Sequence, residues 1–305
     1  MKPAQKAWAG LVSAVVIFGC LAASSQAADT VDQAIATCTA KVADTATKPD
    51  DSDVNTQFCR GLVASFRDKD SAKAHIWFLK SAENGYAPAQ FFVATQFEHG
   101  DGVAKDSTKA LDWILKAAGQ ELSEAEVAAG TWLYYGSEAV KADPARAVGF
   151  LRKAADAGDP QAQALLAEAY YDGKGVKQDY AEAVRWYTRA AYRQHPHAMF
   201  VLGTMYAFGK GVDKNEAAGL SWLKSAAELN DPQAQFQLAR VYMEGSEAVK
   251  DLSQADMWFH VYLLNIPGAP PEEMARLEKS LTPEQINKAQ TDAQTRHVAI
   301  TKGQP

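Results

Sequence analysis

Residues 196–231 read PHAMFVLGTMYAFGKGVDKNEAAGLSWLKSAAELND, and residues 160–195 before them read PQAQALLAEAYYDGKGVKQDYAEAVRWYTRAAYRQH. Both stretches begin with a proline, contain a Gly-Lys-Gly-Val loop and end with a tryptophan-containing segment. The same register continues along the chain, because an aromatic residue recurs every 36 or 37 positions, at Trp77, Trp113, Phe150, Trp186, Trp222 and Trp258. Repetition at this period indicates stacked helical units that form a solenoid.

Two columns of small residues keep the same register. One lies three positions before each aromatic residue, at Ala74, Ala110, Ala147, Ala183, Gly219 and Ala255. The other consists of Ala94, Gly130, Ala167, Gly203 and Ala239. Small side chains at a fixed helical position allow two helices to approach closely, so we expect both columns to be buried. The aromatic column is expected to fill the space between neighbouring units.

Each unit is predicted to form a helix, a loop and a second helix. The first helix begins near a proline, which suits a first helical turn because its missing N–H is not needed there; these prolines are Pro88, Pro160, Pro196 and Pro232. Loop glycines such as Gly173 and Gly209 permit the left-handed backbone at a helix end. The second helix follows a good N-cap residue, at Asp106, Asp143, Asp179, Asn215 or Asp251.

The combined pattern resembles a known repeat family. Leu-Gly-x-x-Tyr, then Gly-x-Gly-Val-x-x-Asp, then Ala-x-x-Trp-x-x-x-Ala-Ala is similar to the Sel1-like repeat, a relative of the tetratricopeptide repeat. The resemblance covers about residues 55–266 as six units, and the units at 160–195 and 196–231 match at almost every position. It implies an all-α, right-handed α-solenoid that holds other proteins.

The chain is predicted to contain four parts. They are a signal peptide at 1–27, an N-terminal capping helix region at 28–54, the repeat solenoid at 55–266, and C-terminal capping helices with a tail at 267–305. Prolines within 266–271 stop the last repeat helix. Two amphipathic helices are expected at 272–280 and 283–297, the second with a capping-box start at Thr282 and Gln285.

The N-terminus has the order of segments found in secretory signal peptides. Lys2 and Lys6 precede a weakly polar run at 7–23, and small residues follow, with cleavage expected after Ala27. This predicts a periplasmic or secreted protein. A retained membrane anchor is one alternative, and a lipoprotein signal with lipidation at Cys20 is another.

Cysteine usage fits export to an oxidising compartment. Apart from Cys20, the chain has only Cys38 and Cys59, an even pair that we expect to form a disulfide. Two separately buried free thiols are the alternative. Neither a Cys-x-x-Cys motif nor a Cys/His cluster occurs, so a redox or zinc role has no support in the sequence.

Composition excludes some classes of protein. The 305 residues are 47% hydrophobic, which is too apolar for a wholly disordered chain. With 31 Lys and Arg residues against 37 Asp and Glu residues, the net charge of −6 repels phosphate. We therefore expect no nucleic-acid partner.

Catalytic motifs are not found, so no enzyme activity, metal or cofactor is expected. The sequence has no Gly-x-Ser-x-Gly, His-Glu-x-x-His or Walker-type motif. The close histidine pair His195 and His197 could hold a metal with a third ligand, but such residues more often begin a surface helix. An alternative function comes from similarity to cysteine-rich Sel1-like proteins associated with penicillin binding or weak β-lactamase activity. Those proteins carry a disulfide in each repeat, which this chain lacks.

The resemblance to tetratricopeptide repeats implies that the first helix of each unit lines a concave face. Aligning the Leu-Gly-x-x-Tyr columns gives a predicted partner-binding groove of Phe91, Thr131, Tyr134, Glu168, Tyr171, Phe200, Thr204, Phe208, Phe236, Arg240 and Met243. Aromatic residues mixed with polar ones suit an extended peptide or a partner helix. The alternative is that some of these rings belong to the core between repeats. The expected partner is an envelope or membrane-associated protein, and no transmembrane segment is expected in the mature chain.

Overall fold

The computed structural model describes residues 36–40, 42, 53–137, 139–245, 249–268 and 271–302. Within these ranges the regular structure is helical and contains no β-strand, and no helix there is both long enough and apolar enough to cross a membrane. The predicted signal peptide, the alternative lipidation site Cys20 and most of the predicted capping region at 28–54 lie outside the described residues. The chain divides into two compact units, residues 1–157 (unit 1) and 158–305 (unit 2).

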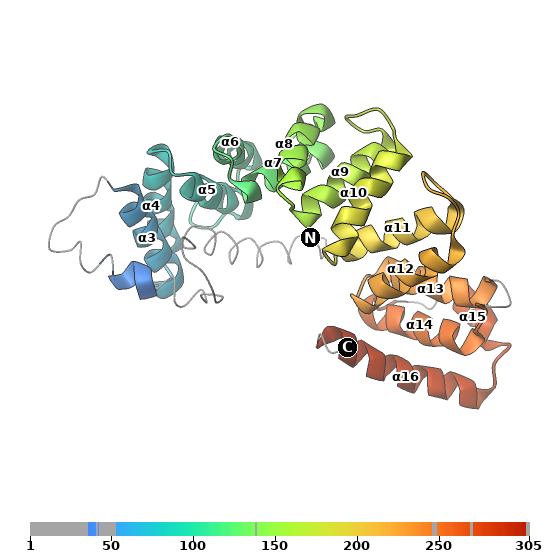
Figure 1. The fold of residues 1–305 in the computed structure, drawn as a ribbon. Coiled ribbons are helices and arrows are strands. Elements are labelled where there is room, and N and C mark those ends of the chain that lie inside the picture. Colours follow the sequence, from blue (N-terminus) through green and yellow to red (C-terminus); the bar gives the residue numbers. More distant parts are fainter. Residues whose placement is uncertain are drawn as a thin grey trace. The chain divides into compact units, whose positions relative to one another are not determined.

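Unit 1 is built from helices that follow one another closely along the chain (Figure 1). Its elements are α3 (Val54–Leu62), the π-helical turn η1 (Val63–Arg67), α4 (Ser71–Glu83), α5 (Ala87–His99), α6 (Ser107–Ala118), α7 (Ser123–Tyr135) and α8 (Pro144–Asp156). Helix α3 packs on α4, α5 on α6, and α7 on α8. Each of the last two pairs is the predicted helix–loop–helix unit.

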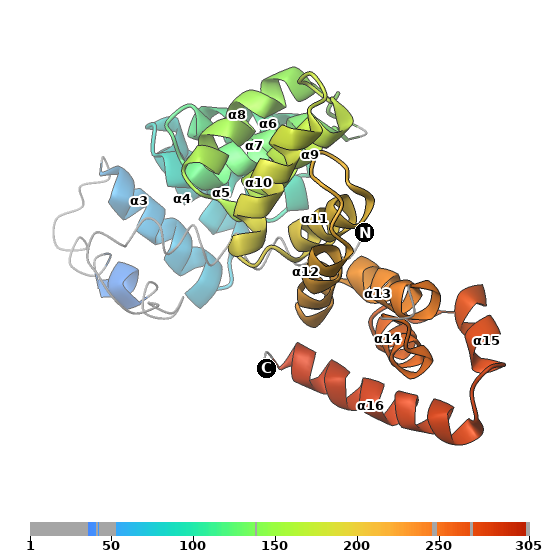
Figure 2. The same cartoon turned by 45° about the vertical axis from the view of Figure 1, so that its right-hand side comes forward.

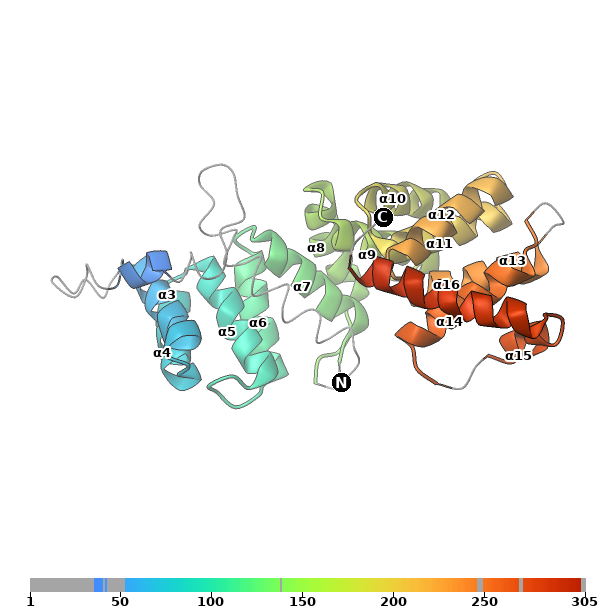
Figure 3. The same cartoon turned by 90° about the horizontal axis from the view of Figure 1, so that it is seen from below.

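Unit 2 continues the pattern with three more pairs and then ends in two further helices. Its elements are α9 (Pro160–Asp172), α10 (Tyr180–Tyr192), α11 (Pro196–Phe208), α12 (Glu216–Glu228), α13 (Pro232–Glu244), α14 (Leu252–Asn265), α15 (Glu272–Glu278) and α16 (Pro283–Thr301). The long helix α16 lies along α14, so that it covers the last repeat helix (Figures 2 and 3). The two terminal helices are therefore present as predicted, with α16 four residues longer than expected.

Both columns of small residues are buried, as the repeat pattern predicts. The contact between Gly203 on α11 and Gly219 on α12 shows why their size matters. A Cβ atom on Gly203 would lie 3.0 Å from the carbonyl oxygen of Gly219 and 3.0 Å from Cγ of Leu223. Close backbone approach at this column thus sets the spacing within each helix pair.

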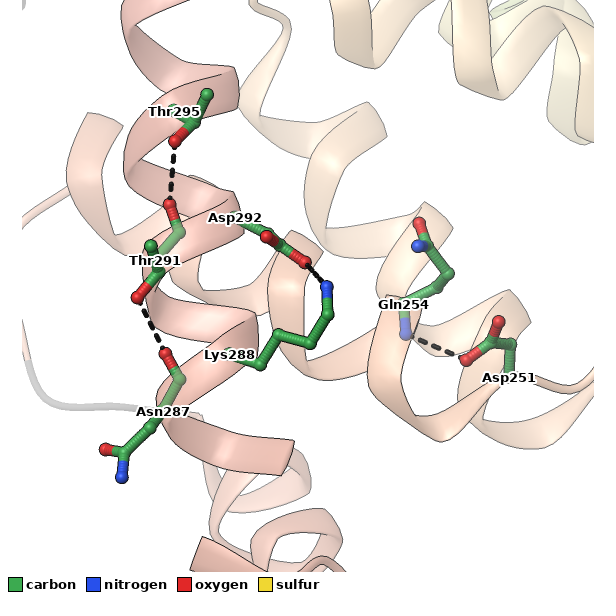
Figure 4. A network of polar contacts seen from close by, with 7 residues as sticks. All are labelled: Asp251, Gln254, Asn287, Lys288, Thr291, Asp292 and Thr295. Carbon is green, nitrogen blue, oxygen red and sulfur yellow. Dashed lines mark hydrogen bonds and ion pairs between the residues drawn. The ribbon is translucent and has the colours of Figure 1, made fainter. Parts of the chain in front are cut away.

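The predicted helix boundaries agree with the observed caps. A side-chain oxygen of each predicted N-cap residue accepts a hydrogen bond from a backbone N–H in the first turn, at Asp106, Asp143, Asp179, Asn215 and Asp251. Figure 4 shows one of these caps, in which the N–H of Gln254 donates to Asp251 over 3.0 Å. Thr282 and Gln285 form the predicted capping box at the start of α16. Gly173 and Gly209 end α9 and α11 in the left-handed conformation.

The aromatic column is less uniformly buried than predicted. Trp186 and Trp258 are buried, whereas Trp77, Trp113, Phe150 and Trp222 are half-buried. Basic side chains lie over the half-buried rings of Trp77 and Trp113. The ammonium of Lys116, one turn after Trp113, lies 3.7 Å from that ring's centroid. Cation–π contact therefore replaces part of the expected contact between repeats.

Cys38 and Cys59 form the predicted disulfide. Both residues are buried, and the bridge joins the helical segment 36–40 to α3. Phe58, next to Cys59, packs against the rings of Phe78 and Phe92 at centroid distances of 5.4 Å. The bridge thus ties the N-terminal segment to the aromatic core of unit 1.

Candidate partner-binding surface

In unit 2, the first helices of the three repeats carry the predicted groove residues in three rows of equivalent repeat positions, with Phe208 next to the third row. All eight of these side chains are half-buried or exposed, namely Glu168, Tyr171, Phe200, Thr204, Phe208, Phe236, Arg240 and Met243. They lie on α9, α11 and α13, and we refer to them as the unit 2 surface. The core-facing positions of the same helices are filled by other residues, such as the fully buried Leu166, Leu202 and Leu238. Phe236 also packs against the buried ring of Phe259 on α14, at a centroid distance of 5.7 Å, so it contributes to the core as well as to this surface.

In unit 1, two of the three predicted groove side chains are buried. Phe91 is 2% exposed and Tyr134 is 1% exposed, so these two rings belong to the core and not to an open surface. Thr131 is half-buried, and its hydroxyl donates to the carbonyl oxygen of Val127 one turn earlier. Phe91 lies in the same hydrophobic cluster as Phe92 and Phe97, since α5 buries aromatic residues on more than one face. The groove prediction for Phe91 and Tyr134 is thus replaced by its alternative, a core position.

Tyr171 belongs to a polar and aromatic cluster that the sequence did not reveal. The ammonium of Lys210 donates a 2.8 Å hydrogen bond to the hydroxyl of Tyr171 and lies 4.0 Å from that ring's centroid. It also lies 4.3 Å from the ring of Tyr180, which meets Tyr171 edge to face at 5.4 Å. The hydrogen bond to Tyr171 raises the pKa of Lys210 above the ordinary lysine value, at which the amine is already charged at neutral pH. The cluster therefore presents a fixed positive charge between two rings.

A repeat comparison could have identified Lys210 and two exposed aromatic residues. Lys210 occupies the same loop position as Lys174, thirty-six residues earlier. Phe208 is 75% exposed and stands where the neighbouring repeats have Asp172 and Glu244. Tyr192 is 76% exposed and contacts Trp222 at a centroid distance of 5.8 Å. An aromatic residue at a column that is otherwise polar is the signal that marks such positions.

In the histidine pair at the start of α11, His195 caps the N-terminus of the helix. The Nδ1 atom of His195 accepts from the backbone N–H of Ala198, so the ring proton lies on Nε2, which donates to Oε1 of Gln161 over 2.9 Å. Burial lowers the pKa of His195 to about 4, and the nearby His197 adds to the lowering. Both nitrogens of His195 are thus engaged, while His197 is exposed beside Phe200.

Known proteins match both the repeats and the fold. A model of the Sel1 repeat matches residues 59–86, 87–121, 123–159, 160–195, 196–231 and 232–260. The chain is 29% identical to a protective antigen of uropathogenic Escherichia coli strains that displays an SLR fold, with a TM-score of 0.75 over 87% of this chain and 58% of the antigen. It is 31% identical to a Sel1 repeat protein from Oxalobacter formigenes, with a TM-score of 0.60 over 69% of this chain and 87% of that one.

The chain thus spans less than two thirds of the length of the Escherichia coli antigen. No curated protein matches it. The six repeat matches cover well over half of the chain and coincide with the helix pairs described above. The chain therefore belongs to the Sel1 repeat family, an all-α solenoid fold whose repeats typically mediate contacts between proteins.

Proposed function

We propose that this protein is an exported adaptor that binds another protein through the unit 2 surface. The observation that carries the proposal is the set of accessible aromatic and polar side chains on α9, α11 and α13, beside a core whose central positions are filled by residues such as Leu166, Leu202 and Leu238. Large aromatic and arginine side chains contribute most to protein interfaces, and Phe200, Phe236 and Arg240 are of these types. The Sel1 fold generally serves as a non-catalytic scaffold, which agrees with a binding role.

The chemistry of the surface indicates a partner segment with both apolar and polar groups. Phe208 offers an exposed ring, and Lys210 offers a charged amine held in place by Tyr171. Glu168 and Arg240 have opposite charges at the same register on α9 and α13. An amphipathic helix or an extended peptide of mixed character would match these groups.

Site-specific crosslinking tests this surface. A photo-crosslinkable phenylalanine analogue is placed at Phe208, and in a matched control at Tyr192, which is equally exposed but lies on α10. We expect the analogue at position 208 to crosslink to one partner protein, and the analogue at position 192 not to crosslink to it. Adding Phe200→Ala and Arg240→Ala should abolish the capture while helical circular dichroism stays unchanged, because neither residue is fully buried.

Equal capture at both positions, or capture that survives the double substitution, would contradict the proposed surface. Capture of no protein, together with binding of labelled penicillin or turnover of a chromogenic β-lactam, would favour the penicillin-binding alternative.

Export is the second part of the proposal. The Cys38–Cys59 disulfide supports it, because such bonds persist mainly in oxidising compartments. Mass spectrometry of the protein from fractionated cells tests this part, with a mature N-terminus at Ala28 as the expected result. An acylated N-terminal Cys20 would replace cleavage after Ala27 by a lipid anchor, and a retained Met1 in the cytosolic fraction would refute export.

A further inference from the structure

Three potential metal ligands converge where the last repeat helix meets the first terminal helix. Asp256 and His260 lie one turn apart on α14, and Glu278 is the last residue of α15. The Nε2 atom of His260 is 3.7 Å from a carboxylate oxygen of Asp256 and 3.8 Å from one of Glu278. One ligand atom from each of the three side chains lies within 4.8 Å of the other two.

Asp256 gives independent evidence that this cluster holds a ligand. Its side chain is fully buried, and neither carboxylate oxygen has a hydrogen-bond partner. The Nε2 atom of His260 is also buried without a hydrogen bond, since 3.7 Å is too long for one. A buried carboxylate that lacks partners is costly, and buried polar groups nearly always have one. Ligand atoms of both residues lie within 4.8 Å of each other and of a carboxylate oxygen of Glu278.

We propose that Asp256, His260 and Glu278 bind a divalent transition-metal ion, with Zn²⁺ as the best-suited ion. An imidazole nitrogen and carboxylate oxygens are ligands that Zn²⁺ accepts, at metal–ligand distances of about 2.0–2.2 Å. Ligand atoms on a tetrahedral ion of that size lie roughly 3.3 Å apart. The separations of 3.7 and 3.8 Å from Nε2 of His260, and the upper limit of 4.8 Å for the cluster, mean that the ligand atoms would move inward by at most about 1.5 Å.

The charges also match a divalent ion. Two carboxylates and a neutral imidazole carry a combined charge of −2, which a divalent cation neutralises within a largely buried site. Three protein ligands leave a fourth position for water, as in zinc sites that are not fully closed. The side chains of His260 and Glu278 are 17% and 34% exposed, so an ion can enter from the Glu278 side.

The position of the site suggests its role in the fold. Helix α15 packs on α14 after the proline-containing connection at 266–271 (Figure 2). A metal held by both helices would fasten α15 to the last repeat helix, α14. Because the unfolded chain lacks this arrangement, the ion would stabilise the folded state, by an amount that grows with the logarithm of its free concentration above Kd.

Calorimetric titration of the full, untagged chain with Zn²⁺ after chelator treatment tests the proposal. We expect one ion per chain, and a rise in Tm of roughly 5–10 °C when free Zn²⁺ is about a hundredfold above Kd. Glu278→Gln keeps the size of a partly exposed side chain and should weaken binding at least about tenfold. Asp256→Asn should do the same, and the visible spectrum of bound Co²⁺ should change in both variants.

Two matched controls exclude binding elsewhere. His99 and Glu284 are exposed residues of the same chemical types, so His99→Gln and Glu284→Gln should leave the affinity unchanged. No binding by the wild type would overturn the proposal, and so would equal affinity of the wild type and Glu278→Gln, which would mark an adventitious surface ion. If Asp256→Asn fails to fold, the Glu278→Gln result decides.

Discussion

The neutral state of His195 makes the stability of unit 2 sensitive to mild acid. The ring caps α11 by accepting from the N–H of Ala198 at Nδ1, and it bonds Gln161 on α9 through Nε2. Protonation of Nδ1 would remove the acceptor and place a positive charge at the positive end of the helix dipole. Burial of the ring, with a smaller contribution from His197, lowers its pKa in the folded state to about 4, whereas the unfolded chain has a value of about 6.5.

The sign of the effect follows from proton binding. Between about pH 6.5 and pH 4 the unfolded chain binds a proton that the folded chain does not, so the free energy of unfolding falls as the pH falls. Each pH unit in this window corresponds to about 1.4 kcal/mol, which gives about 2 kcal/mol between pH 6.5 and pH 5. Because the residue is not fully buried, water reduces this to about 1–2 kcal/mol.

His195→Asn separates this effect from other titrating groups. Asparagine is also a good N-cap, so the variant keeps an acceptor at this position but does not titrate. We expect the wild type to lose about 1–2 kcal/mol more than the variant between about pH 7.5 and pH 5. Urea unfolding monitored by helical circular dichroism measures the difference, and an NMR titration of the imidazole measures the pKa directly.

The adjacent His197 provides the control. It is exposed and is the smaller cause of the lowered His195 pKa, so His197→Asn should leave most of the pH dependence in place, because the burial of His195 remains. An identical pH dependence in the wild type and His195→Asn would refute the reasoning. A measured His195 pKa near that of a free histidine would refute it independently.

The remaining predictions concern the Cys38–Cys59 disulfide and the close contacts between helices. Reduction of the Cys38–Cys59 bond, which spans 21 positions, should destabilise unit 1 by about 3 kcal/mol in thermal unfolding, whereas Cys38→Ser/Cys59→Ser should not respond to the reductant. Gly203→Ala should cost about 1–3 kcal/mol, because the new Cβ would crowd the backbone of Gly219. At the exposed helix position Gly149, a new Cβ would meet nothing within 4 Å, so Gly149→Ala should instead stabilise the protein by about 0.5–1 kcal/mol. Urea unfolding measures both variants, and a change in stability of the same sign for Gly203→Ala and Gly149→Ala would contradict the contact argument.

The repeat architecture could be predicted from the sequence because it depends on local rules. Asp143 followed by Pro144 begins a helix through hydrogen bonds and backbone angles that involve only the next few residues. The burial of Ala183 could be predicted because a small side chain recurs at that position in every repeat, where two helices approach closely. In a solenoid, each unit contacts only its neighbours, so a pattern along the chain is also a pattern of contacts.

The candidate-site residues were less predictable, because residues at equivalent positions in different repeats are not equally buried. Phe91 and Phe200 occupy the same column, yet Phe91 is buried in the aromatic core of unit 1 while Phe200 is half-exposed on unit 2. Tyr134 and Tyr171 differ in the same way. The side-chain volumes of the neighbouring helices decide which ring is covered, and the repeat register does not contain that information.

The sequence by itself thus determined the helices, their caps, the small-residue contacts and the cysteine pair, since each follows from residue type and spacing. Only the tertiary structure placed the ammonium of Lys210 on Tyr171, thirty-nine positions away, and brought Glu278 of α15 to Asp256 and His260 of α14. These groups meet because helix packing fixes the rotation of each helix about its axis and the path of the connecting loops. That rotation results from the sum of many side-chain contacts, and no short motif encodes it.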